Sequence, residues 1–365
     1  MIEHFSSSTC PPCVNVNYAM ANLTAANPGK YTYTKYPCYW PGAGDPYCND
    51  DTRTRVAFYA CNAAPQTFLD GIDQGFTSVT QGALDEHYAT PAFADVRGAF
   101  NVQGNTINVT ADFMSYFNMS GINAYISINE KTTTGNVGTN GETEFHHILM
   151  KMLEDGNGNP LELNIGEYKR FEYSFDMSST FVEEMNDLEV SLWIQDPVSR
   201  EIFNSRFAYE YTEHCYPVQN LTADFSEDGS AINVAWEAPE TGTPTGYNIY
   251  INGVLMEENY TSTSYTNNEL ATELYNMPKN HYVEVRTMYA DDKSSVSLMD
   301  IFASGVNVSE INETSSFNVY PNPASDFVKV STDNSQQTTV RIYNVLGMLV
   351  EEIEINSNET EINVS

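Results

Sequence analysis

The chain has 365 residues, enough for about two to four domains of ordinary size. It carries 16 Lys and Arg residues against 49 Asp and Glu residues, which gives a formal net charge of −33, and 41% of its residues are hydrophobic. So acidic a chain is not expected to bind nucleic acid or anionic membrane surfaces, because both attract Lys and Arg. No apolar run approaches the roughly 18 residues of a membrane-spanning helix, so no transmembrane segment is expected.

The first thirty residues predict a short strand followed by a helix that opens at two cysteines. Residues 2–5 are typical of the end of a strand. The helix is predicted from apolar residues at helical spacing, namely Val16, Ala19, Met20 and Leu23. We expect Cys10 at the N-cap, where the positive end of the helix favours a thiolate. Cys13 would follow one turn later, where it could attack a mixed disulfide formed at Cys10.

The rest of the first ninety residues continues an alternating α/β pattern. Residues 31–36 alternate like a half-buried strand, and Asp50 or Asp51 is suited to cap a helix over residues 52–61. Pro65 precedes a short apolar strand that ends in the turn Asp70-Gly71. A strand over residues 72–76 and a helix over 77–88 complete a predicted order of β-α-β-α-β-β-α.

Residues 1–92 resemble a thioredoxin-like domain. The resemblance depends on Cys-Pro-Pro-Cys at the first helix and on Ala64-Pro65-Gln66-Thr67-Phe68, which stands where that fold carries its cis-proline loop. It implies that Cys10 is the attacking thiol and Cys13 the resolving thiol. It also implies that Ala64 and Pro65 belong to the loop that faces the disulfide and receives substrate.

Two departures from the family pattern bear on the chemistry. Thr9 stands where many relatives have Trp, which removes an aromatic shield. Pro11 and Pro12 both lack an N–H group that could stabilise a Cys10 thiolate. A less stabilised thiolate makes the disulfide harder to reduce, so we expect a reducing or neutral centre rather than a strong oxidant.

The other four cysteines are expected to form disulfides in an oxidising compartment. Cys38 and Cys48 bracket a Pro- and Gly-rich loop that contains Trp40, and a bridge between them would make this loop one wall of the site. The alternative is Cys48–Cys61, with Cys38 left over. Cys61 could also pair with Cys215 across a domain boundary.

No metal site or cofactor is expected. A zinc site would need a second close cysteine pair or neighbouring histidines, and His4 is the sole imidazole near Cys10 in the sequence. Asp155-Gly156-Asn157-Gly158-Asn159 begins like a calcium loop, but Pro160 replaces the required glycine and Gly166 stands at the twelfth position. A hairpin turn explains that segment better.

Residues 93–213 read as a run of alternating strands without an intervening helix, which predicts an antiparallel β-sandwich. Together with the first domain, this sandwich resembles the secreted relatives of the outer membrane protein 28 family of Bacteroidetes. The segments that carry this resemblance are Trp40-Pro41-Gly42 with Asp45-Pro46, Phe145-His146-His147-Ile148-Leu149, and Trp193-Ile194-Gln195-Asp196 before Ile202-Phe203. The resemblance implies a fold and a location outside the cell, and it does not imply a substrate.

Residues 214–303 resemble a fibronectin type III domain. The pattern consists of a strand that ends in Trp236, a strand over residues 246–251 and a strand over residues 282–289. Such modules are usually spacers or protein-contact surfaces. We therefore expect no chemistry from this domain.

Residues 304–316 are polar and form a predicted linker. Phe317-Asn318-Val319-Tyr320-Pro321-Asn322-Pro323 and Val340-Arg341-Ile342-Tyr343-Asn344-Val345-Leu346-Gly347 then resemble the C-terminal sorting domain of the type IX secretion system of Bacteroidetes. Residues 317–365 lack the usual last strands of that domain, which is expected to be incomplete. The resemblance implies cargo of the type IX machinery, secreted or held on the outer-membrane surface, with a lost leader. A periplasmic lipoprotein is the alternative address.

The predicted fold class is thus a thioredoxin-like α/β domain followed by antiparallel β-sandwich domains and a partial sorting sandwich. The predicted function is thiol–disulfide exchange on protein substrates, with Cys10, Cys13 and Pro65 as catalytic residues and Ala64 and Trp40 in contact with substrate. The alternative is a non-catalytic binding or structural protein that uses the first domain as a scaffold. The oligomeric state is not predicted.

Overall fold

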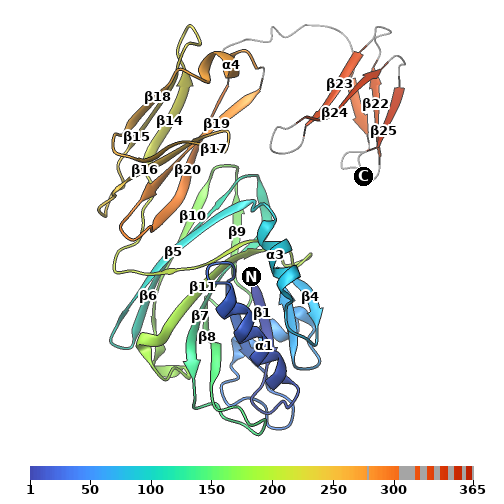
Figure 1. Cartoon of the computed structure of the whole chain (residues 1–365), viewed down its shortest axis with the longest axis vertical. Coiled ribbons are helices and arrows are strands. Elements are labelled where there is room, and N and C mark those ends of the chain that lie inside the picture. The colour runs from blue at the N-terminus through green and yellow to red at the C-terminus, as the bar shows by residue number, and fades with distance from the viewer. Residues whose placement is uncertain are drawn as a thin grey trace. The chain divides into compact units, whose positions relative to one another are not determined.

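The computed structural model describes residues 1–277, 279–303, 317–320, 327–332, 338–343, 349–355 and 359–363. The chain divides into two compact units, Met1–Gly305 and Val306–Ser365. Figure 1 shows that the first unit combines a small α/β part with layered β-sheets. Among the described residues, no helix has the length and apolar character needed to cross a membrane.

The chain begins with the predicted β-α-β-α-β-β-α order. Its elements are β1 (Ile2–Ser6), α1 (Cys13–Ala26), β2 (Tyr33–Pro37), α2 (Asp50–Tyr59), β3 (Gln66–Leu69), β4 (Ile72–Gly75) and α3 (Gln81–Ala89). Strand β1 pairs parallel with β2 and antiparallel with β3, and β4 pairs antiparallel with β3. One face of this small sheet packs against α1 through Ile2, Met20 and Leu69, whose side chains share a buried cluster.

Two predicted helix starts differ from the structure. Helix α1 begins at Cys13 with Pro12 as its N-cap, so Cys10 lies in the turn before the helix and not at its N-cap. Proline has no side-chain acceptor, and no side-chain cap is formed there. Helix α2 is capped by Asn49, whose Oδ1 atom accepts from the backbone N–H of Thr52 at 2.9 Å. Asp50 and Asp51 fall in its first turn instead, where negative charge favours the helix dipole.

The sandwich that follows shares a sheet with this α/β part. Nine strands form one sheet, which adds β7 (Met119–Thr133), β8 (Phe145–Leu153), β9 (Asn159–Leu163), β11 (Leu188–Gln195) and β12 (Ile202–Phe207) to β1–β4. Strand β8 lies parallel to β2, with Ile148 opposite Lys35. The predicted division at residue 92 stays a prediction, but the sheet itself continues across it.

A second sheet packs over the first to complete the sandwich. It contains β10 (Tyr168–Asp176), β6 (Thr106–Ser115), β5 (Ala94–Gln103) and β13 (Tyr209–Glu210). Their inward side chains, including Val96, Phe113 and Leu192 of β11, are fully buried in one core. Two 3₁₀ turns, Met177–Ser179 and Met185–Asp187, lie between β10 and β11. Strand β10 alternates because one of its faces is more buried than the other, whereas β11 is buried on both faces.

Residues 219–303 form a further sandwich. One sheet has β14 (Gln219–Phe225), β15 (Ile232–Glu237) and β18 (Ser264–Asn267); the other has β17 (Val254–Tyr260), β16 (Gly246–Ile251), β19 (Asn280–Met288) and β20 (Ser294–Ala303). The short helix α4 (Ala271–Tyr275) precedes β19. Trp236 lies in its core, as expected. Asp95 of β5 ties the two sandwiches together, because it pairs with Arg97 at 2.8 Å and with Arg286 of β19 at 2.7 Å.

The described residues of the second unit form five strands in two sheets. One sheet has β21 (Phe317–Tyr320), β22 (Phe327–Thr332) and β25 (Glu359–Asn363), and the other has β23 (Thr338–Tyr343) and β24 (Leu349–Ile355). Val330 and Ile362 are buried in its core. The predicted linker over 304–316 and parts of the two predicted sorting motifs lie outside the described residues.

A buried polar network joins the α/β part to the sandwich on the α2 face of the shared sheet. Glu3 of β1 and Arg55 of α2 form a fully buried ion pair at 2.6 Å. Arg55 also donates to Oε1 of Gln195 on β11 at 2.8 Å. The hydroxyls of Tyr36 and Tyr59 donate to Glu3 as well. The carboxylate is thus surrounded by donors, which is the condition for burying a charge.

Candidate redox site

Cys10 and Cys13 form a disulfide in the turn that leads from β1 into α1. Their Cα atoms lie 5.3 Å apart. Cys10 is 1% exposed and Cys13 is 0% exposed, whereas Pro11 and Pro12 between them are exposed. The two prolines therefore form the visible surface of the turn, and the sulfur atoms lie beneath it.

Two loops with cis-proline bonds flank the disulfide, at Ala64–Pro65 and at Trp40–Pro41. The Sγ atom of Cys10 lies 3.3 Å from the carbonyl oxygen of Ala64. On the other side, the hydroxyl of Thr9 donates to the carbonyl oxygen of Pro41 at 2.6 Å. The structure thus brings Cys10, Cys13, Ala64 and Pro65 together. Trp40 belongs to the second of these loops, and its neighbour Pro41 makes the contact with the turn.

A third segment covers the turn, and the sequence did not reveal it. This covering loop, residues 134–144, connects β7 to β8. The backbone N–H of Asn140 donates to the carbonyl of Ser8 at 3.0 Å. The side chain of Asn17 on α1 donates to both carboxylate oxygens of Glu142 at 3.0 Å. The glycines of this segment indicated a loop, but its partner lies more than a hundred residues earlier in the chain.

Asp45 connects these three parts of the site. Its carboxylate accepts from the backbone N–H of Ser8 at 2.9 Å and from the backbone N–H of Tyr47 at 3.0 Å. It also accepts from the Asn136 side chain of the covering loop at 3.4 Å. Burial raises the pKa of Asp45, although these hydrogen bonds act in the opposite direction. One buried carboxylate thereby fixes the turn, the loop after β2 and the covering loop.

A row of buried polar side chains crosses the sheet on the face that α1 covers. Lys35, His4 and Thr67 are register neighbours on β2, β1 and β3. Ser6 lies two residues after His4 and therefore on the same face, and its hydroxyl donates to Asn17 of α1 at 3.1 Å. Burial and the nearby Lys35 lower the pKa of His4 well below its ordinary value. The sequence pattern did not predict that these polar side chains would be buried together between the sheet and α1.

Replacing Lys35 with Met is expected to stabilise the protein in a pH-dependent way. Burial lowers the pKa of Lys35 from 10.5 to about 8, against the opposing charges of Glu142 and Asp45. Below pH 8 the folded chain carries this buried charge, so Lys35→Met should raise the free energy of unfolding by about 1–3 kcal/mol there. Between pH 8 and 10.5 the unfolded chain binds a proton that the folded chain does not, so wild-type stability rises and the advantage shrinks.

The measurement is urea unfolding of wild type and Lys35→Met between pH 6.5 and 9.5. Lys131→Met is the matched control, because the Lys131 side chain is 41% exposed. A difference between wild type and Lys35→Met that stays constant across this range would contradict the prediction.

The remaining cysteines correct the expected disulfides. Cys38, Cys48, Cys61 and Cys215 are free thiols in the structure, so the Cys38–Cys48 bridge and both alternatives are not formed. The Sγ atom of Cys38 faces the carbonyl of Tyr36, and that of Cys48 faces the carbonyl of Asn49. Backbone hydrogen bonds close the loop instead, including one from Asp45 to Cys38 at 2.8 Å. Burial raises the pKa of Cys61 and of Cys215 to about 12, which keeps both thiols protonated.

Metal ligands do not gather anywhere in the part of the chain that the structure describes, where no group of three His, Cys, Asp or Glu residues could hold an ion. His146 and His147 each face a carboxylate, at 3.2 Å for Glu144 and 2.6 Å for Glu189. Each imidazole therefore already interacts with a carboxylate of the protein.

Substituting Gly138 with Ala is expected to expose the disulfide. A Cβ atom at Gly138 would lie 2.4 Å from the carbonyl oxygen of Ser8, so the covering loop must move away from the turn. Overpacking of this kind costs about 1–3 kcal/mol, which corresponds to a gain of about five- to 150-fold in the open population. The rate at which dithiothreitol reduces Cys10–Cys13 should rise accordingly.

Gly82→Ala on α3 is the control, because a Cβ atom there meets nothing within 4 Å. The extent of reduction is measured by alkylating the released thiols and determining the mass of the protein by mass spectrometry. An unchanged rate in Gly138→Ala would show that the loop does not limit access to the sulfur atoms.

Comparison with known proteins gave one family match and several distant structural neighbours. Residues 318–365 match the secretion system C-terminal sorting domain. The comparison with curated proteins gave no significant match. HBP35 of Porphyromonas gingivalis aligns at 12% identity and a TM-score of 0.45, covering 83% of this chain and 96% of that one. A fibronectin-III-like protein from Clostridium thermocellum aligns at 20% identity and a TM-score of 0.20, covering 23% and 88%.

The sorting-domain match indicates the cellular location of the protein. It confirms the expectation that residues near the C-terminus are read by a secretion system, and it implies contact with that machinery. The chain is a secreted or cell-surface protein of Bacteroidetes.

Proposed function

We propose that residues 1–92 form a thioredoxin-like domain that performs thiol–disulfide exchange on protein substrates outside the cell. The observation that carries this proposal is the contact between the Cys10 sulfur and the carbonyl of Ala64, just before cis-Pro65. A cysteine pair at a strand-to-helix turn, set against a proline loop, is an arrangement suited to disulfide exchange. The resemblance of this domain and the following sandwich to secreted relatives of the outer membrane protein 28 family stays a prediction.

The exchange proceeds in two steps. In the reducing direction, the Cys10 thiolate attacks a substrate disulfide, and a Cys10–substrate bond forms as one substrate thiolate leaves. The Cys13 thiolate then attacks Cys10 Sγ, which releases the second substrate thiolate and restores the Cys10–Cys13 bond. Two electrons pass to the substrate, and an external thiol donor returns them to the pair. In the oxidising direction a substrate dithiol runs the same steps backwards.

The surroundings of Cys10 favour the disulfide over the dithiol. The Ala64 carbonyl oxygen would repel a Cys10 thiolate at 3.3 Å, although it would accept a hydrogen bond from the neutral thiol. Pro11 and Pro12 offer no N–H groups to the anion. Both features raise the free energy of the thiolate, so the pair is a weak oxidant.

A second candidate is a structural role. The burial of both cysteines favours it, because a protein substrate cannot reach Cys10 until the segments around the turn move. In that case the disulfide would fix the turn, and the sandwiches would carry the contacts with other molecules. The two candidates differ in whether Cys10 ever forms a bond to a substrate.

Replacing Cys13 with Ser is expected to trap that bond. Without the resolving thiol, Cys10 should stay joined to one chain of insulin after reaction with an insulin disulfide. Mass spectrometry of alkylated peptides identifies the cysteine that carries the adduct. Cys10→Ser is the control, since it removes the attacking thiol and leaves a Cys13 that is 0% exposed. Adducts at half-buried Cys48 alone, or none at all, would contradict exchange at Cys10.

A further inference from the structure

A cavity of the first unit lies away from the disulfide. It has a volume of about 560 Å³, within the usual range of small-molecule sites. Residues 29–32, the end of β3 and helix α3 line one side, and residues 201–209, which include β12, line the other. Cys10 and Cys13 are not among its lining residues, so the cavity is separate from the candidate redox site.

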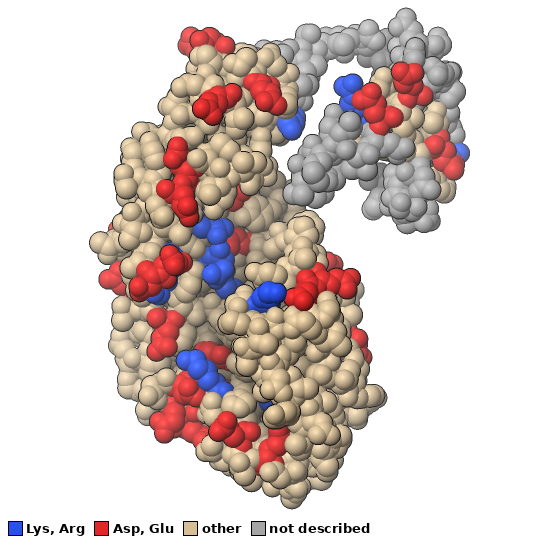
Figure 2. Space-filling view, in the orientation of Figure 1, with Lys and Arg blue, Asp and Glu red and all other residues tan. Residues whose placement is uncertain are grey.

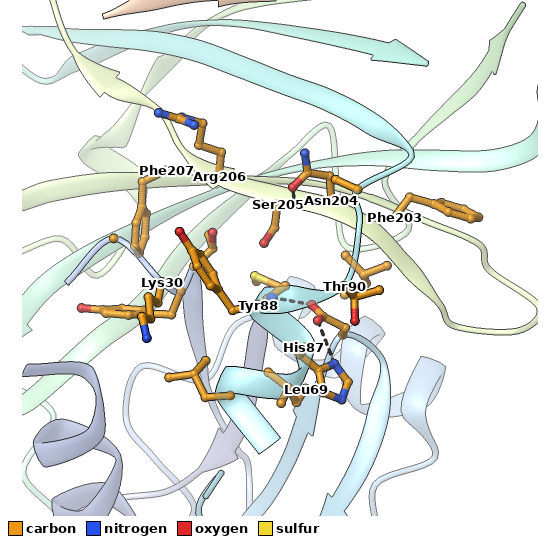
Figure 3. A pocket seen from close by; sticks show the side chains of 18 of the residues that line it. Lys30, Leu69, His87, Tyr88, Thr90, Phe203, Asn204, Ser205, Arg206 and Phe207 are labelled. Atoms are coloured by element: carbon orange, nitrogen blue, oxygen red, sulfur yellow. Dashed lines mark hydrogen bonds and ion pairs between the residues drawn. The ribbon is translucent and has the colours of Figure 1, made fainter. Parts of the chain in front are cut away.

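Six aromatic side chains contribute to its walls. They are Tyr31, Tyr88, Phe93, Phe203, Phe207 and Tyr209. Tyr88 on α3 is 59% exposed, so one ring of the cavity is accessible to a ligand. Figure 3 shows Tyr88 and Phe207 reaching from α3 and β12 into the space between these elements. Tyr31 meets Phe207 edge to face at 6.0 Å, which fixes the orientation of the Phe207 ring.

Polar groups in the cavity offer both donors and acceptors. Asp70 holds the His87 ring at 2.9 Å, and the Ser205 side chain also reaches toward the space (Figure 3). Asn204 is fixed by its hydrogen bond to the carbonyl of Ala94 at 2.6 Å. Lys30 Nζ lies 5.6 Å from the centre of the Tyr88 ring. The arrangement can therefore bond to hydroxyl groups on a ligand whose faces contact the rings.

The charges of the lining nearly cancel and so favour a neutral ligand. Lys30, Arg206 and the Met1 amino group are opposed by Glu201 and by Asp70, which pairs with that amino group. The chain as a whole carries −33, and on the face shown in Figure 2 acidic side chains are spread over the first unit while basic ones form small groups. This field repels anions. The exposed Tyr88 ring, both kinds of hydrogen-bonding group and a lining of little net charge together fit a sugar, which has apolar ring faces and an edge of hydroxyl groups.

We propose that this cavity binds a neutral carbohydrate, with a sugar ring stacked on Tyr88 and its hydroxyls bonded to groups on β12. The site is independent of the proposed redox function. It would give a cell-surface protein a means to recognise a glycan while the disulfide acts elsewhere, or does not act at all.

The test uses the full chain on an array of neutral oligosaccharides of glucose, mannose, galactose and N-acetylglucosamine, beside uronic-acid oligomers. Calorimetry then measures the dissociation constant of the strongest binder. Tyr88→Ala should weaken binding about tenfold or more, because the stacking face is lost. Tyr88→Phe should retain it. Ser205→Trp, which fills the cavity, should abolish it, and Tyr18→Ala is the matched control because Tyr18 is 72% exposed on α1.

Binding of neutral sugars that falls in Tyr88→Ala and Ser205→Trp but not in Tyr18→Ala supports the proposal. It is overturned if no neutral sugar binds at millimolar concentration, if uronic-acid oligomers alone bind, or if both cavity variants bind like wild type. Cys10→Ser should bind sugar normally, so a failure of the redox proposal leaves this result unaffected.

Discussion

Replacing Arg55 with Leu is expected to cost about 3–5 kcal/mol of the free energy of unfolding of the first unit, because it leaves the Glu3 carboxylate buried without its counter-charge. Both side chains of the ion pair are fully buried. The guanidinium also packs 4.6 Å from the ring centre of Tyr125 on β7, so the loss extends into the sandwich. Urea unfolding followed by circular dichroism measures the effect.

Arg53→Leu is the matched control for this variant, two residues earlier on the same helix. Arg53 is exposed and lies 4.5 Å over the ring of Tyr39. An exposed cation–π contact of this kind contributes about 0.5–1 kcal/mol. Equal losses in the two variants would contradict the view that the Glu3–Arg55 pair holds the α/β part to the sandwich.

Local patterns were enough to predict most of the elements in this fold. The strands of the sandwiches alternate because one face is buried, and Trp236 marks a core position for the same reason. The parallel pairing of β8 with β2 could not be predicted in this way. This pairing joins residues over a hundred positions apart, and the periodicity within a strand does not indicate which other strand it pairs with.

In the candidate site too, residues marked by local sequence signals were predicted and contacts between distant segments were not. Cys10, Cys13 and Pro65 were predicted because cysteine spacing and a proline before a strand are local signals. The covering loop was missed, because Asn140 meets Ser8 through backbone groups that any residue type provides. The Cys38–Cys48 bridge was wrong because two cysteines that bracket a loop need not face each other. There a hydrogen bond from the Asp45 backbone to Cys38 closes the loop.

Changing Cys10 to Ser is expected to have the largest effect on activity of any single substitution. In the proposed function all exchange passes through a bond to the Cys10 sulfur, and serine cannot form it. Cys48→Ser is the control, since that thiol is half-buried and free but outside the site. The variant should keep the fold, because outside the disulfide the Cys10 side chain meets the Ala64 carbonyl oxygen at 3.3 Å and, within the part of the chain that the structure describes, anchors no buried network.

The most direct test of the redox proposal is the reduction of insulin with dithiothreitol as electron donor, followed by turbidity as the insulin chains separate. Wild type and Cys48→Ser should exceed the rate of dithiothreitol alone, and Gly138→Ala should exceed wild type. Cys10→Ser should fall to the rate of dithiothreitol alone. Wild-type protein that adds nothing to that rate, or a Cys10→Ser variant as active as wild type, would contradict the proposal and leave the disulfide a structural feature.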